Sequence, residues 1–133
     1  MTPPAVSDRE RGRGTPAVYV VLQTLKKRSD FLRAARAGRH VAASMLVQGR
    51  ARDDGDPAVR VGFTCSKKVG NAVARNRAKR RLRAVAREVL PGMARPGWDY
   101  VLIGRPDVTV KCPYDRLRAD LALALKRLHQ KRK

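Results

Sequence analysis

Residues 62–83 constrain the fold more than any other part of the chain. They read GFTCSKKVGNAVARNRAKRRLR. Apolar and polar residues alternate from Val59 to Cys65, which predicts a strand with one apolar face. Gly70 and Asn71 then predict a turn followed by a helix, because glycine tolerates unusual backbone angles and asparagine is a favourable helix N-cap. We therefore expect a strand that a tight turn joins directly to a helix.

The predicted helix spans residues 72–90 and ends before Pro91 and Gly92. Its two sides differ sharply. Residues 67–87 contain nine cations and no acid, although cations four residues apart on a helix repel one another. A solvated helix face would instead mix both charges. One side carries the apolar stripe Ala78, Leu82, Val85 and Val89, and the opposite side carries Asn76, Arg80, Arg83 and Arg87.

The charge of the whole chain indicates the same kind of partner. Its 133 residues, enough for one domain, include 31 Lys and Arg against 11 Asp and Glu, a net charge of +20. Such a balance favours a polyanion, with nucleic acid the stronger interpretation and an anionic membrane the weaker one. No apolar run is long enough to span a bilayer, and the first residues lack the apolar segment of a signal peptide. Cys65 and Cys112 are too few for a disulfide framework, so we expect a cytoplasmic protein.

The part before residue 40 is expected to hold a tail and a short helix. Residues 1–17 are rich in proline and glycine, which is typical of a disordered tail. Residues 31–37 follow a possible cap at Ser29 or Asp30, and Gly38 supplies a stop signal. We therefore predict a helix over residues 31–37 and place the folded domain at residues 18–130.

The remaining segments complete an α+β pattern. One or two strands are expected over residues 40–50 with a kink near Ser44, and another over 98–103. A last helix is expected over 114–129, followed by a basic tail at 131–133. The order of helix, strands, long helix, strand and helix predicts one sheet with helices packed on it. The apolar stripe of the last helix is Leu117, Leu121, Leu125 and Leu128.

No constellation for protein-borne catalysis or metal binding is apparent. The only histidines are His40 and His129, and no acid stands beside either one. Residues 53–57 read DDGDP, which favours a hairpin turn, and a calcium loop is excluded because the distal Glu is missing. We therefore predict no catalytic and no metal-ligating residue.

The segment from Ser66 to Arg80 resembles the signature of a known family. Ser66 begins the run SKKVGNAV, which is followed by Arg75-Asn76-Arg77 and Lys79-Arg80, and these residues closely resemble the signature of the bacterial ribonuclease P protein subunit. Weaker similarity extends over roughly residues 25–127. The resemblance implies an αβββαβα two-layer sandwich with one mainly antiparallel sheet and the basic helix after its third strand.

The resemblance also implies a function. Family members bind a catalytic RNA, and the complex removes the 5′ leader from precursor tRNA. The active site and its Mg²⁺ belong mainly to the RNA and the substrate, not to a dedicated protein site. The expected partners are the ribonuclease P RNA and precursor tRNA, with a protein monomer in a 1:1 complex with the RNA. The alternatives are a general basic RNA- or ribosome-binding protein and a self-sufficient nuclease.

Site residues follow by position from the same resemblance. Phe31, Val47 and Thr64 are expected in a leader cleft between the sheet and the first helix. A second aromatic often stands one turn after Phe31, where this chain has Ala35. From the residues alone, Phe31 is either a core or a stacking residue, and Asn76 is either a solvated amide or an RNA contact. The expected RNA-binding residues are Lys67, Lys68, Asn71, Arg75, Asn76, Arg77, Lys79, Arg80 and Arg83.

Overall fold

A computed structural model describes residues 22–65 and 67–131. The tail predicted over residues 1–17, Ser66 and residues 132–133 lie outside this range. Along the chain the elements are β1 (Leu22–Thr24), α1 (Arg28–Arg36), β2 (Gly38–Val41), β3 (Met45–Ala51), β4 (Val59–Cys65), the 3₁₀ turn η2 (Lys67–Val69), α2 (Ala72–Met93), β5 (Trp98–Gly104), α3 (Val108–Lys111) and α4 (Tyr114–Lys131).

The five strands form one mixed sheet in the order β1-β4-β5-β3-β2. The pairs β1–β4 and β4–β5 are parallel, whereas β3–β5 and β2–β3 are antiparallel. The α+β class is therefore confirmed, but the expectation of a mainly antiparallel sheet is corrected. The physical reason is the long connection through α2, which returns the chain so that β5 runs in the same direction as β4.

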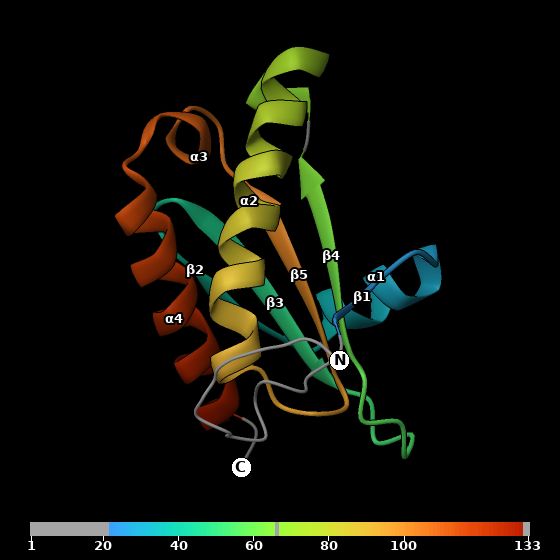
Figure 1. Cartoon of the computed structure of the whole chain (residues 1–133). Helices are drawn as coiled ribbons and strands as arrows, with labels where there is room; N and C mark the ends of the chain where they lie inside the picture. The colour runs from blue at the N-terminus through green and yellow to red at the C-terminus, as the bar shows by residue number, and fades with distance from the viewer. Residues whose placement is uncertain (1–21, 66, 132–133) are drawn as a thin grey trace, which may run out of the picture.

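Helices cover both faces of this sheet (Figure 1). α2 and α4 lie side by side on one face, and α1 packs on part of the other. We call the first the helical face and the second the open face. The two-layer sandwich thus carries a partial third layer. The main core lies on the helical face, where buried side chains of α2 and α4 meet those of β3, β4 and β5.

The apolar stripe predicted for α2 is largely confirmed. Ala78, Leu82 and Val85 are fully buried, whereas Val89 is only partly buried and Leu90 takes its place in the core. The shift reflects the 3.6-residue turn, because a strict pattern of heptads drifts around a straight helix. The stripe predicted for α4 is buried throughout: Leu117, Leu121, Leu125 and Leu128.

Several element boundaries differ from those expected. α1 begins at Arg28 with Lys27 as its N-cap, and no side-chain cap forms because a lysine side chain has no acceptor. The expected cap Asp30 lies inside the first turn, and its carboxylate lies 3.4 Å from both Arg33 and Arg60 in ion pairs. α2 continues through Pro91 to Met93, since the amide of Ala94 donates to the carbonyl of Leu90 and closes the last turn. The sequence patterns did not predict β1 or α3.

Candidate nucleic-acid interface

The start of α2 is set by two neighbouring residues. Gly70 has a φ of +139°, and a Cβ at this position would lie 2.9 Å from the Cβ of Ala74. Only glycine fits such a turn without displacing the helix. The side chain of Asn71 then accepts a hydrogen bond of 3.0 Å from the amide of Ala74, which confirms the predicted N-cap. Together they hold the first turn of α2 directly after β4 and η2.

The outward side of α2 is a row of cations, which we call the α2 cationic face. Within the described part of the chain, no carboxylate lies within ion-pair distance of its members. Their fields therefore add instead of cancelling, which favours a polyanionic partner. The members are Arg75, Arg77, Lys79, Arg80, Arg83 and Arg87, of which Arg75 and Lys79 are half-buried and the others are exposed.

Other residues expected to bind RNA lie close to this face. Lys68 is exposed on η2, and Lys67 belongs to the same turn, although only its backbone is described. Asn76 is exposed among the cations. The side chain of Asn71 already caps α2, and Arg75 donates a hydrogen bond of 3.3 Å to the carbonyl of Gly70. The structure thus brings the expected set together around the first half of α2.

One cation of the helix has a different role. Arg81 turns toward α3, where its guanidinium donates to the carbonyls of Thr109 at 3.1 Å, Cys112 at 2.7 Å and also Val110. A cation is favourable at the carboxyl end of a helix, where carbonyl groups lack partners. The chain carries no local signal that separates Arg81 from Arg80, because the difference depends on the position of α3.

Phe31 lies on the open face, against Gly62 of β4. A Cβ at Gly62 would stand only 2.5 and 2.6 Å from two atoms of the Phe31 ring. The absence of a side chain at position 62 therefore creates the space for the ring. Leu25, Ala34 and Val101 are buried beside it. Phe31 itself is half-buried, so it combines packing with a surface that a ligand can reach.

Of the other two residues expected in the cleft, only Thr64 shares this face. It lies two positions after Gly62 in β4 and is paired with Ile103 of β5. Val47 is fully buried in the main core on the helical face, so its assignment to the cleft is wrong. The register places Leu46 opposite Ile103 and therefore on the open face. Because Leu46 and Val47 are both apolar, the sequence pattern does not show which of them faces the main core.

A buried carboxylate anchors α1 from beneath. The side chain of Asp99 has no exposed surface and accepts two hydrogen bonds of 2.7 Å from Arg60, one of 2.8 Å from Arg52 and one of 3.5 Å from Arg50. Arg60 also lies 3.4 Å from Asp30, the residue before Phe31 in α1. We call Asp99 with these three arginines the Asp99 cluster. It ties the first turn of α1 to the sheet and so helps to position Phe31.

The most strongly shifted pKa values belong to the core near the end of α4. Burial lowers the pKa of His129 to about 4 and raises that of Tyr100, and the two side chains are 2.8 Å apart. The nearby Arg95 also disfavours the protonated form of His129. The rings of His129 and Tyr100 pack around Trp98. The end of α4, which carries His129, lies at the opposite end of the sheet from the start of α2 (Figure 1). These rings contribute to the core and not to the α2 cationic face.

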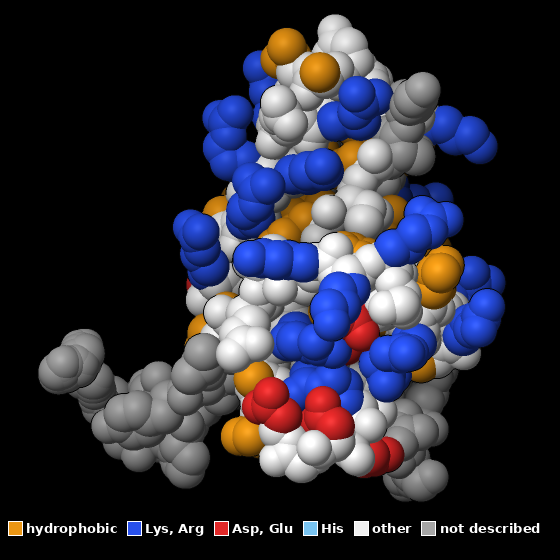
Figure 2. Space-filling view, turned by 90° about the vertical axis from the view of Figure 1, so that its right-hand side faces the viewer, with side chains coloured by type: hydrophobic (Ala, Val, Ile, Leu, Met, Phe, Trp, Pro, Cys, Tyr) orange, Lys and Arg blue, Asp and Glu red, His pale blue; other side chains and the backbone are white. Residues whose placement is uncertain are grey.

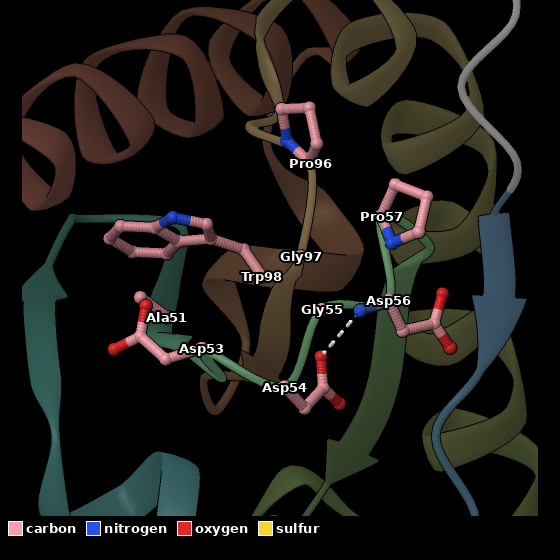
Figure 3. Close-up of a pocket in the computed structure, with 9 residues that line it drawn as sticks. All are labelled: Ala51, Asp53, Asp54, Gly55, Asp56, Pro57, Pro96, Gly97 and Trp98. Carbon is pink, nitrogen blue, oxygen red and sulfur yellow. Dashed lines mark hydrogen bonds between the residues drawn. The ribbon is translucent and has the colours of Figure 1, made fainter.

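The aspartate loop at residues 52–58 is built as a turn. Asp54 accepts from the amide of Asp56 and from Arg52, and Asp56 accepts from the amide of Ala58. Figure 3 shows the carboxylates of Asp53, Asp54 and Asp56 pointing in separate directions around a cavity of about 260 Å³. Within the described residues, no group of three potential metal ligands converges. The donor set therefore does not fit a protein-held Mg²⁺ here.

The surface joins the α2 cationic face to the region of Phe31. Figure 2 looks onto the sheet edge formed by β1 and β4, where Lys and Arg side chains border a strip of visible hydrophobic atoms. The acidic side chains in this view gather mostly toward the lower end. A basic surface with apolar atoms between its charges suits single-stranded nucleic acid, which presents both phosphates and flat bases. Within the described residues, no helix is long and apolar enough to cross a membrane.

Comparison with known proteins gives a consistent result. The profile of the Ribonuclease P family matches residues 21–129. The chain is 65% identical to a ribonuclease P protein component of Ruegeria pomeroyi, over 86% of this chain and 95% of that protein. It is 52% identical to that of Caulobacter vibrioides, over 77% and 68% respectively. Among solved structures, the RNase P protein from Thermotoga maritima superimposes with a TM-score of 0.66 at 28% identity, over 79% of this chain and 96% of that one.

Proposed function

Since the chain belongs to the ribonuclease P protein family, we propose that it works as the protein subunit that binds the ribonuclease P RNA through the α2 cationic face. Its function lies in tRNA processing, within an endoribonuclease complex. The observation that carries the assignment of the surface is the row of α2 cations without a carboxylate partner in the described residues. Uncompensated charge on a rigid helix is costly by itself and is favourable once phosphates neutralise it.

The RNA-binding set combines three kinds of contact. Arg77, Arg80 and Arg83 are exposed and can each fork onto a phosphate. Lysines act as point charges. Asn76 stands among them with an amide that both donates and accepts, which suits a base edge or a 2′-hydroxyl. The full proposed set is Lys67, Lys68, Asn71, Arg75, Asn76, Arg77, Lys79, Arg80 and Arg83.

The 5′ leader of precursor tRNA is assigned to the open face. Phe31 supplies a half-buried ring and Thr64 a hydroxyl, and Ile103 and Leu46 extend an apolar floor from Thr64 across β5 and β3. An aromatic ring beside a basic surface stacks on bases with little regard to sequence. This arrangement supports leader binding, and Ala35 leaves it with a single stacking ring from α1.

Catalysis is assigned to the RNA, with Mg²⁺ held mainly by the RNA and the substrate. The described part of the protein has no converging set of metal ligands. The protein acts as one copy for each RNA and lowers the Mg²⁺ concentration that the complex needs. Its cations do this by screening phosphate repulsion where the RNA and the leader approach each other.

The test is reconstitution of cleavage at low Mg²⁺. The full chain is mixed with ribonuclease P RNA and precursor tRNA, and the product is compared with that of either macromolecule alone. We expect cleavage above the RNA-only rate, and none from the protein by itself. Equal binding to an unrelated RNA of the same length, with no gain in cleavage, would instead identify a general RNA-binding protein.

A matched pair of variants assigns the activity to a surface. Arg80→Ala with Arg83→Ala removes two charges from the α2 cationic face. Lys126→Ala with Arg127→Ala removes two exposed charges from α4. We expect only the first pair to reduce the stimulation. Equal loss from both pairs would show that overall charge, and not this face, determines assembly.

A further inference from the structure

A cavity of about 320 Å³ opens at the sheet edge, between α2 and the strands β1 and β4. Its apolar wall includes Leu22, Val61 and Phe63, and its charged wall consists of Lys79, Arg83 and Arg87. Its size falls at the lower end of the range for small-molecule sites. The lining also includes Leu25 and Phe31, so the cavity adjoins the leader surface of the open face. It differs from that surface in its charged wall from α2 and in Phe63, whose side chain belongs to the helical face.

The cavity exists because β1 is shorter than β4. β1 pairs only with residues 59–61 of β4, and the last bond between them joins the amide of Leu25 to the carbonyl of Val61 at 2.9 Å. β4 continues to Cys65, and in the described structure no strand lies beside its outer edge after Val61. α2 passes over this gap and presents Lys79, Arg83 and Arg87, which are four residues apart and therefore lie on one side of the helix.

The lining is apolar on one side and cationic on the other, and few ligands match both sides. Its three cations face no acid in the lining, so the occupant is an anion. The Arg83 guanidinium stands 5.9 Å from the centre of the Phe63 ring, in cation–π geometry. A flat group next to this pair gains from both the ring and the planar guanidinium. An anion with a flat, largely apolar part is the chemical description of a nucleotide.

We propose that this cavity receives one unpaired nucleotide of the ribonuclease P RNA, with its base against Phe63 and its phosphate between Lys79 and Arg87. This inference rests on the proposed function, because it extends the contact made by the α2 cationic face. The RNA subunit is the source favoured by geometry, since Arg83 and Arg87 continue the same helix side as Asn76 and Arg80. The site thus adds a stacking contact to the phosphate contacts and the Asn76 contact proposed for this surface.

The experiment is a nucleotide-resolution chemical footprint on ribonuclease P RNA, with the full chain and without precursor tRNA. Wild type is compared with Phe63→Leu, which removes the ring but keeps apolar bulk, and with Phe63→Tyr, which restores a ring. We expect Phe63→Leu to expose a single unpaired nucleotide and to weaken binding roughly 5- to 150-fold, the range for one lost stacking contact. Phe63→Tyr should behave as wild type.

The salt dependence separates the two walls of the cavity. Arg87→Gln should reduce the slope of log K against log[salt] by about 0.7, whereas Phe63→Leu should lower affinity with the slope unchanged. Thermal melts of each variant identify any loss of RNA affinity that comes from unfolding. If Phe63→Leu unfolds, the footprint of Arg87→Gln is compared with that of wild type instead.

Three results would overturn parts of this assignment. If wild type leaves no footprint, the proposed function itself fails. If wild type leaves a footprint and both Phe63→Leu and Arg87→Gln leave the same footprint as wild type, only the cavity proposal fails. If the nucleotide protected by Phe63 appears only after precursor tRNA is added and maps to the leader, the occupant is the substrate and the assignment to the RNA subunit is wrong.

Discussion

Arginines are concentrated in two regions of this protein, and the two regions use them in opposite ways. In the Asp99 cluster, Arg50, Arg52 and Arg60 surround one buried carboxylate at 2.7–3.5 Å. On the α2 cationic face, no carboxylate in the described structure compensates the charge. The comparison shows that the number of arginines does not identify a binding surface. The surface is identified by arginines that have no carboxylate partner among the described residues.

The energetic consequences differ as well. A buried guanidinium is tolerated only if it is paired and hydrogen-bonded, and Arg52 meets this condition by also donating to the carbonyls of Trp98, Asp56 and Ala58. An exposed arginine on α2 contributes little to folding, because solvent screens it. The first region should therefore respond to mutation through stability and the second through RNA affinity.

The largest expected effect is a test of the buried region. Asp99→Ala leaves three arginines without their shared acceptor and should lower the free energy of unfolding by about 3–5 kcal/mol, the usual cost of breaking a buried ion pair from one side. Urea unfolding followed by circular dichroism measures it. Asp99→Asn keeps an acceptor and should cost less. A loss below about 1 kcal/mol from the alanine variant would contradict the structural role of the cluster.

The next effect examines the opposite side of α2. Leu82 is fully buried in the main core. Leu82→Ala should cost about 2–5 kcal/mol because it removes packing and leaves a cavity. Arg80→Ala in the same helix should change stability by less than about 0.5 kcal/mol. Melts in the reverse order would mean that the facing of α2 is wrong.

A third substitution tests whether the space that Gly62 leaves beside the Asp99 cluster positions the Phe31 ring. Gly62→Ala places a methyl group against the ring and should cost about 1–3 kcal/mol by overpacking. We expect a higher KM for precursor tRNA with a smaller loss of affinity for ribonuclease P RNA, because the α2 cationic face is left intact and only the edge of the cavity at Phe31 is disturbed. Gly92→Ala is the matched control, since a Cβ there meets nothing within 4 Å. An unchanged KM would argue against Phe31 as a leader contact.

The α2 cationic face should respond mainly to salt. If about five phosphates are neutralised, log K for ribonuclease P RNA should fall with log[salt] at a slope of roughly −3.5. Arg80→Ala with Arg83→Ala should reduce the slope by about 1.4 and weaken binding about tenfold near physiological salt. Filter binding over a salt series measures both quantities. A slope near zero for wild type would show that this face is not the interface.

The smallest expected effect is a pH dependence of stability. It sharpens the comparison because its titrating group, His129, belongs to neither arginine region. His129 has a pKa of about 4 in the folded protein, below its ordinary value of 6.5, because burial disfavours its charged form. The unfolded chain therefore binds more protons between these two pH values, so stability is complete above about pH 6.5 and decreases toward pH 4. Urea unfolding at pH 7.5 and 5.0 should show this decrease. It should shrink in His129→Gln, and an equal decrease in that variant would assign the titration to another group.

Local interactions explain what the sequence was sufficient to predict. The strand at Val59–Cys65, the Asn71 cap and the division of α2 into apolar and cationic sides depend on residues one to four positions apart. Such neighbours already meet in a single strand, turn or helix. Amphipathic spacing and turn chemistry therefore determine this part of the protein without any tertiary contact.

Contacts between distant segments were decided by tertiary structure alone. Leu46 and Val47 are both apolar, and only the pairing of β3 with β5 shows which of them lies on the open face. Arg80 and Arg81 are adjacent and identical, yet the position of α3 makes one an outward charge and the other a partner of backbone carbonyls. The chain's basic character and its exposed helix follow from sequence, whereas the role of each arginine depends on which acids and carbonyls folding brings beside it.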